Sequence, residues 1–134
     1  MRYWIIGIIT IVIFSFLIAY NPNSKYLGVY TDDITIELEG IDDGYKWSYE
    51  INNDNLKLNK EGVLSNNDYE EKNDKELYYW NWLPVKDGET KIVFKYSKEN
   101  HDLYTIYYEL KIVKNKIYWT KGEAKGLTDY PNPY

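Results

Sequence analysis

The chain of 134 residues contains no cysteine, one histidine and four prolines. Without cysteine, disulfides, thiol catalysis and thiolate metal sites are all excluded, so the folded part must be stabilised by its core alone. Positive charge is also scarce, because 16 Lys and Arg stand against 21 Asp and Glu and give a net charge of −5. Nucleic acid is therefore not an expected partner, since nucleic-acid binding requires clustered Lys and Arg.

The one long apolar run of the sequence covers residues 3–20. Two interpretations of this run remain open: a signal peptide that is removed, or a membrane anchor that is retained. A helix over residues 4–20 would be about 26 Å long, close to the ~30 Å of a hydrocarbon core, and Trp4 and Tyr20 suit the two membrane interfaces. We predict that residues 1–24 are a signal peptide or an anchor that contacts the membrane through residues 4–20. The domain that follows then lies outside the cell membrane, or is secreted if the leader is cleaved.

Aromatic residues are abundant, with 16 Tyr and five Trp, and this composition favours β-structure. Tyr45, Trp47, Tyr49 and Ile51 occupy alternate positions, so in a strand they share one face while the polar residues between them face water. The same alternation predicts seven short strands, over residues 33–39, 45–52, 56–58, 77–83, 91–96, 103–113 and 117–119. Seven short strands separated by turns are typical of an all-β, immunoglobulin-like β-sandwich. We expect one N-terminal hydrophobic helix before it, and a compact barrel is the alternative fold.

The segments between these strands give the expected connections. Residues 60–76 are polar and acidic without a period, which predicts a long exposed loop. The dipeptide Asp87-Gly88 is a strong signal for a hairpin turn between two flanking strands. Residues 121–134 contain two glycines and two prolines and are interpreted as a flexible C-terminal tail. The sandwich domain is therefore expected to span residues 25–120.

Residues capable of chemistry are present, but not in patterns that indicate a reaction. His101 is the only histidine, and the nearest loop hydroxyl, Ser97, lies four residues away, which does not make a catalytic pair. The amides and carboxylates of residues 66–74 lack the spacing of a calcium-binding EF-hand loop. We predict that the protein is not an enzyme and has no catalytic residue, no metal site and no cofactor.

The strand that contains Tyr78, Trp80 and Trp82 allows two interpretations. Exposed aromatic rings on one face could form a platform for sugar rings, whereas the same spacing also suits a strand that faces the core. The core interpretation is the one expected here, because alternate residues of a strand face opposite sides and a platform requires at least two exposed, coplanar rings.

Two motifs resemble the chagasin family, whose members are exported or lysosome-directed inhibitors of papain-like cysteine proteases. The first is Gly44-Tyr45-x-Trp47, which is similar to the Gly-aromatic-x-Trp that opens a strand after the first inhibitory loop of the family. The second is the alternating hairpin pattern Trp80-x-Trp82-x-Pro84-x-x-x-Gly88-x-x-x-Ile92-x-Phe94-x-Tyr96. The resemblance covers residues 34–113. It implies an immunoglobulin-like sandwich, a protein partner of the papain-like cysteine protease class, and a monomer.

The resemblance also implies three loops that would block a protease cleft, over residues 40–44, 72–76 and 97–102. The candidate protein-binding residues in these loops are Ile41, Asp42, Asp43, Gly44, Asn73, Asp74, Lys75, Lys98, Glu99 and Asn100. The loop sequences depart from those of the family. The first loop lacks the usual Asn-Pro-Thr-Thr, the second contains no glycine, and the third lacks Arg-Pro-Trp. The alternative function is a membrane-tethered immunoglobulin-like binding or structural module without inhibitory activity.

Overall fold

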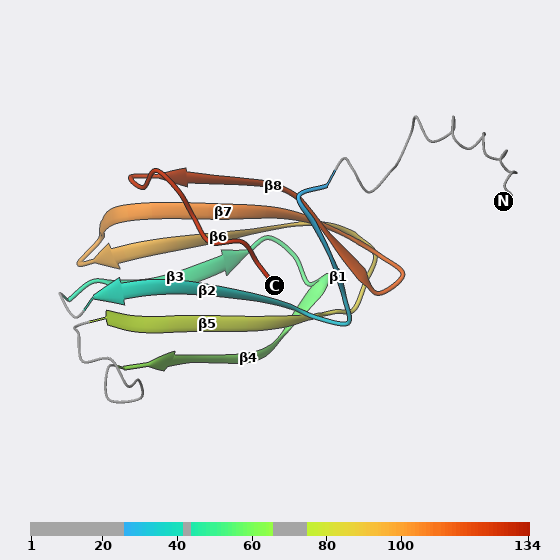
Figure 1. The fold of residues 1–134 in the computed structure, drawn as a ribbon, viewed down its shortest axis with the longest axis horizontal. Coiled ribbons are helices and arrows are strands. Elements are labelled where there is room, and N and C mark those ends of the chain that lie inside the picture. The colour runs from blue at the N-terminus through green and yellow to red at the C-terminus, as the bar shows by residue number, and fades with distance from the viewer. Residues whose placement is uncertain (1–25, 42–43, 66–74) are drawn as a thin grey trace, which may run out of the picture.

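A computed structural model describes residues 26–41, 44–65 and 75–134 of the chain. These residues form eight strands: β1 (Gly28–Thr31), β2 (Ile34–Ile41), β3 (Lys46–Ile51), β4 (Leu56–Leu64), β5 (Lys75–Pro84), β6 (Gly88–Lys98), β7 (His101–Val113) and β8 (Lys116–Lys125). The strands make a five-stranded antiparallel sheet, in the order β1-β8-β7-β6-β3, and a three-stranded one, in the order β2-β5-β4 (Figure 1). The predicted all-β class is confirmed, with eight strands in place of seven.

The described ranges contain no helix, and so none that is long and apolar enough to cross a membrane. The predicted N-terminal helix and the segment considered for calcium binding lie outside the described residues.

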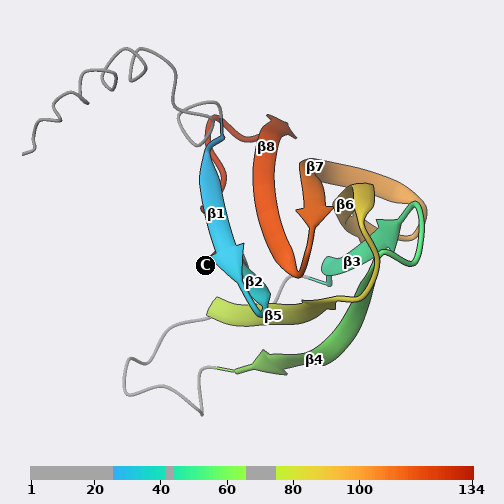
Figure 2. The ribbon, with the colours of Figure 1, turned by 90° about the vertical axis from the view of Figure 1, so that its right-hand side faces the viewer.

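The core lies between the two sheets, and the five-stranded sheet arches over the three-stranded one (Figure 2). Each sheet sends every second side chain inward, as the sequence alternation predicts. Phe94 is fully buried near the centre, and its ring lies 4.8 Å from that of Trp80 and 5.8 Å from that of Tyr108. Tyr78, Trp80 and Trp82 are all buried, so the core interpretation of this aromatic row is confirmed.

The Asp87-Gly88 turn does not make the hairpin that the sequence predicts. It connects β5 in the three-stranded sheet to β6 in the five-stranded sheet, so the chain passes from one layer to the other. The backbone N–H of Val85 donates to the Asn55 carbonyl at 2.9 Å, and the Asp87 carboxylate accepts the Lys114 N–H at 2.9 Å. These bonds join the turn to the β3–β4 and β7–β8 connections, and they take the place of the hydrogen-bond ladder that a hairpin would have formed.

Several strands exceed their predicted limits: β6 and β7 continue into residues 97–98 and 101–102 of the predicted third loop, and β4 and β8 are extended most. β4 continues to Leu64, through residues 60–64 that the sequence analysis assigned to an exposed loop. β8 continues to Lys125, through residues 121–125 that were assigned to the flexible tail. Both extensions are rich in charged and small residues, so they carry no apolar alternation, and pairing with β5 and β7 holds them in the sheets. β1 is too short to show a pattern and was not predicted.

Residues 126–134, here called the C-terminal strap, cross from β8 to β2 and close one side of the sandwich (Figure 1). Tyr134 ends the crossing with a backbone N–H···O bond of 2.8 Å to Thr35 and accepts the Thr35 N–H at 2.5 Å. The buried Tyr108 hydroxyl donates to the Pro131 carbonyl at 2.8 Å, and the Tyr30 hydroxyl donates to the Pro133 carbonyl at 3.0 Å. The expectation of a loose tail therefore differs from the structure, because side chains from other strands hold the strap.

Candidate functional site

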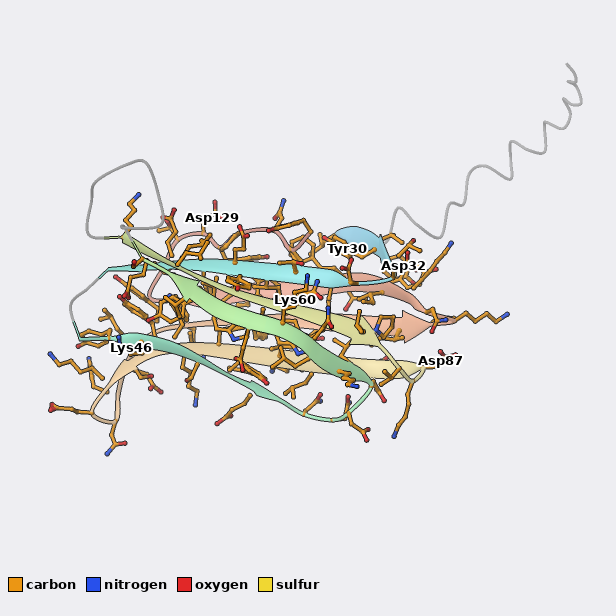
Figure 3. The ribbon with its side chains drawn as sticks, turned by 90° about the horizontal axis from the view of Figure 1, so that it is seen from below. Tyr30, Asp32, Lys46, Lys60, Asp87 and Asp129 are labelled. Carbon is orange, nitrogen blue, oxygen red and sulfur yellow. The ribbon has the colours of Figure 1, made fainter. Side chains whose placement is uncertain are left out.

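The strand ends that flank three connections meet at one end of the sandwich, which we call the tip. The connections join β2 to β3, β4 to β5 and β6 to β7, and the strand ends that flank them lie at the left in Figure 1. The pairing register places their flanking residues side by side, since Ile41 opposes Lys75 and Lys46 opposes Ser97. Figure 3 shows Lys46, the first residue of β3, at this end, with Asp87 at the other. The convergence that loop binding requires is therefore present in the residues that flank the loops.

Two glycines let the first connection approach its neighbours closely. Gly44 has a φ of +92°, a conformation that other residues rarely adopt, and a Cβ there would lie 2.9 Å from the Lys98 Nζ. At Gly40, a Cβ would lie 3.2 Å from ring atoms of both Tyr78 and Tyr96. The connection from β2 to β3 is therefore fitted tightly against β5 and β6.

A tryptophan links the two sheets at the base of the same connection. The indole N–H of Trp47, on β3, donates a hydrogen bond of 3.0 Å to the backbone carbonyl of Glu39, on β2. Trp47 is buried, and its ring lies 4.9 Å from that of Tyr96. Since β2 and β3 belong to different sheets, this bond fixes the distance between the two ends of the first connection.

The third connection is a two-residue hairpin turn with a fixed backbone. Glu99 and Asn100 have φ values of 49° and 68°, which is the pattern of a type I′ turn and which Asn tolerates better than most residues. On its flanks, the Ser97 hydroxyl donates to the Asp102 carboxylate at 2.6 Å, and the Lys95 Nζ lies 4.0 Å from the same carboxylate. The turn therefore projects from the tip in one defined conformation.

A column of aromatic rings supports the tip from beneath. Tyr45 stacks on Tyr96 with ring centres 5.5 Å apart, and Tyr96 stacks on Tyr104 at 5.6 Å. The imidazole of His101 meets the edge of Tyr45 at 6.2 Å, and the Lys98 Nζ lies 5.8 Å above the same ring. The first and third connections therefore rest on one rigid cluster. Alternation in the sequence placed Tyr45 and Tyr96 on inward faces, but it did not show that they stack beneath the loops.

Tyr78 extends this support to the second connection. Its hydroxyl donates to the Glu76 carboxylate at 3.4 Å, just after the start of β5. Burial, and then the negative charge of Glu76, raise the pKa of Tyr78 to about 12. The phenol therefore remains a neutral hydrogen-bond donor at any physiological pH.

The structure places six of the ten predicted site residues. Ile41 and Lys75 are paired, Gly44 lies against Lys98, and Glu99 and Asn100 form the hairpin turn, so all six belong to the tip. The other four, Asp42, Asp43, Asn73 and Asp74, lie outside the described residues.

His101 and Ser97, the described residues of the tip that were considered for catalysis, have other partners. The Ser97 hydroxyl is bonded to Asp102 and the imidazole of His101 lies against Tyr45, so these two side chains do not form a nucleophile and base pair. Within the described part of the chain, no group of three or more His, Asp or Glu is placed to hold a metal ion. The described tip therefore offers shape, hydrogen bonds and charge for contact with another molecule.

No protein-family model matches the sequence, and no curated protein matches it either. Among solved structures, the fold is similar to that of the cysteine protease inhibitor EhICP2 from Entamoeba histolytica, with a TM-score of 0.53 and 22% sequence identity. The similarity covers 63% of this chain and 81% of the inhibitor. At this identity, the comparison establishes a shared fold.

Proposed function

We propose that the described strands form an immunoglobulin-like sandwich of the chagasin type, and that its tip blocks papain-type cysteine proteases. The convergence at the tip of the strand ends that flank three connections carries this proposal, because a cleft must be filled from one end of the inhibitor. The fold shared with a cysteine protease inhibitor and the two chagasin-like motifs support it. The mechanism is occlusion without a covalent step: the tip occupies the cleft and substrate is excluded.

The rigidity of the tip suits this mechanism. Binding costs free energy for every segment that must be ordered, so loops that are already fixed bind more tightly. The Trp47 to Glu39 bond holds together the two strands that flank the first connection, and the left-handed Glu99-Asn100 turn fixes the third. A stable protein interface needs about 800 Å² on each partner, and three adjacent connections can provide such an area.

Titration of the full chain against papain, with a fluorogenic peptide substrate, tests the proposal. We expect stoichiometric, reversible loss of activity, and prior alkylation of the protease thiol should not abolish complex formation, because no covalent step is involved. Absence of inhibition at about 10 μM inhibitor, which corresponds to less than about 7 kcal/mol of binding free energy, would contradict the proposal.

A membrane-tethered binding or structural module on the same scaffold is the second candidate function. Its support is the loop chemistry, since residues 72–76 contain no glycine and Lys and Glu side chains would hinder a close backbone approach to a catalytic thiol. This candidate predicts binding to a surface protein or glycan with protease activity unchanged. The papain titration therefore separates the two functions.

We further propose that residues 1–24 direct the domain across the cell membrane. The support is the apolar run of residues 3–20, as either a cleaved signal or an anchor that contacts the membrane through residues 4–20. N-terminal sequencing of the protein recovered from cells separates these two possibilities. Recovery of the intact chain only in the soluble cytoplasmic fraction would contradict both.

A further inference from the structure

The outer face of the three-stranded sheet is more apolar than an exposed face requires. β5 is its central strand, and Leu77, Tyr79 and Leu83 point outward from it, opposite the buried Tyr78, Trp80 and Trp82. Strands that are apolar on both faces are usually covered on both faces. Leu64 on β4 lies next to Leu77 and is 37% exposed, so the apolar column extends onto the neighbouring strand.

This face is also flat and its central polar group is satisfied. A Cβ on Gly62 would lie 2.6 Å from the Tyr79 hydroxyl oxygen, so the ring lies down over the backbone of β4. The side chain of Asn81, 7% exposed, donates to the Thr35 hydroxyl at 2.8 Å and accepts from Asn59 at 2.8 Å. Because the Asn81 amide already has partners on both neighbouring strands, it would keep its hydrogen bonds if this face were buried.

Charges of opposite sign flank the apolar column. On the β4 side, the exposed Lys57 and Lys60 point outward, as their pairing with Leu83 and Asn81 requires. On the β2 side, Glu37 and Glu39 point outward beside Tyr79 and Leu77, and Asp33 lies near Asn81. Glu37 accepts the Tyr134 hydroxyl, and Glu39 lies 3.6 Å from Lys75, but that pair is largely exposed and weakly held.

A surface of this pattern is complementary to itself. A two-fold axis between two copies, parallel to their strands, places β4 of each copy over β2 of the other and the β5 columns over each other. Lys60 of each copy then lies over Thr35 of the other, because both pair with Asn81, and its side chain lies between Asp33 and Glu37 of the other copy. An axis perpendicular to the strands would instead place β4 over β4 and β2 over β2, which brings strands of like charge together, so the charges favour the first arrangement.

We propose that the outer face of the three-stranded sheet binds a second copy of this chain through the parallel two-fold axis, with sheet packed on sheet. This differs from the monomer that the sequence analysis predicts. The three strands have eight, ten and nine residues and cover about 14 by 30 Å, or about 420 Å² per copy, which is at the low end of specific interfaces. Association is therefore expected to be weak, with a Kd on the order of 10 μM. Both tips point the same way and remain free, so this proposal does not depend on protease inhibition.

Sedimentation velocity of the full chain in a density-matched detergent tests the proposal. We expect Lys60→Glu and Glu37→Lys each to raise the dimer Kd about five- to tenfold, because each creates two repelling pairs per dimer, and the double variant to restore it. Lys111→Glu, on the outer face of the five-stranded sheet, is the matched control and should leave the Kd unchanged.

Carbodiimide cross-linking of mixed light and isotope-labelled chains gives a second measurement. The expected product joins Lys60 of one copy to Glu37 or Asp33 of the other. A chain that stays monomeric at about 200 μM would overturn the proposal, whether the outer face of the three-stranded sheet stays empty or binds a different protein. Association that responds to neither Lys60→Glu nor Glu37→Lys would also overturn it, because residues 3–20 would then be the cause of association.

Discussion

Removal of a single hydroxyl group tests whether the C-terminal strap is a structural part of the domain. The hydroxyl of Tyr108 donates to the Pro131 carbonyl at 2.8 Å from within the core, where the tyrosine side chain is fully buried. Tyr108→Phe keeps the ring and leaves the carbonyl without its donor. Loss of a hydrogen bond to a carbonyl of the exposed Pro131 costs about 0.5–1.5 kcal/mol, which lowers Tm by about 3–10 °C for a domain of this size.

Tyr107→Phe is the matched control, one residue away on the same strand. The Tyr107 hydroxyl donates to the Glu123 carboxylate at 2.7 Å on the exposed face, where water can replace it. Thermal unfolding of both variants followed by circular dichroism should therefore show a lower Tm for Tyr108→Phe only. Hydrogen exchange should also become faster at the Tyr134 amide, which pairs with Thr35 at the end of the strap. Equal Tm values for the two variants, or unchanged exchange at Tyr134, would refute this account of the strap.

Three further predictions concern the tip and the buried phenols. Trp47→Phe leaves the Glu39 carbonyl without its indole donor and should lower the free energy of unfolding, measured in urea, by about 1–3 kcal/mol. A decrease below about 0.5 kcal/mol would show that the bond contributes little. Gly44→Ala places a Cβ at a φ of +92° and 2.9 Å from the Lys98 Nζ. It should therefore lower stability by about 1 kcal/mol or more and weaken protease inhibition. An unchanged inhibition constant would argue against a role for the first connection. Burial raises the pKa of Tyr108, and burial with the charge of Glu76 raises the pKa of Tyr78 to about 12. Because the folded state holds these protons more tightly than the unfolded state, the free energy of unfolding should be full below pH 10 and should fall as the pH rises from there. Urea unfolding midpoints at pH 8, 10 and 11 can measure this fall.

Much of the fold could be predicted because most core strands alternate cleanly. The inward faces around Ile36, Trp80 and Phe94 follow from the sequence, since any other register would expose these residues to water. Turn chemistry was less informative. Asp87-Gly88 predicts a sharp turn, but it does not determine whether the next strand pairs with the last one or joins the other sheet.

The strap and the tip required information that local sequence does not contain. Residues 126–134 have no alternation, and they are held by hydroxyls of Tyr30 and Tyr108 that lie far away in the chain. The candidate loops were placed by resemblance, whereas the stack of Tyr45 on Tyr96 depends on the pairing of β3 with β6. Long-range pairing of this kind is the part of the site that composition and periodicity could not predict.

The most direct test of the proposed function compares two matched turns at opposite ends of the sandwich. Asn100 at the tip and Asn115 in the β7–β8 turn have φ values of 68° and 67°, so replacement of either by Ala should cost a similar ~1 kcal/mol of stability. The inhibition constant for papain should rise at least about tenfold with Asn100→Ala and should remain unchanged with Asn115→Ala. Equal inhibition constants for the two variants, or no inhibition by the unaltered chain, would contradict the claim that the tip blocks the protease.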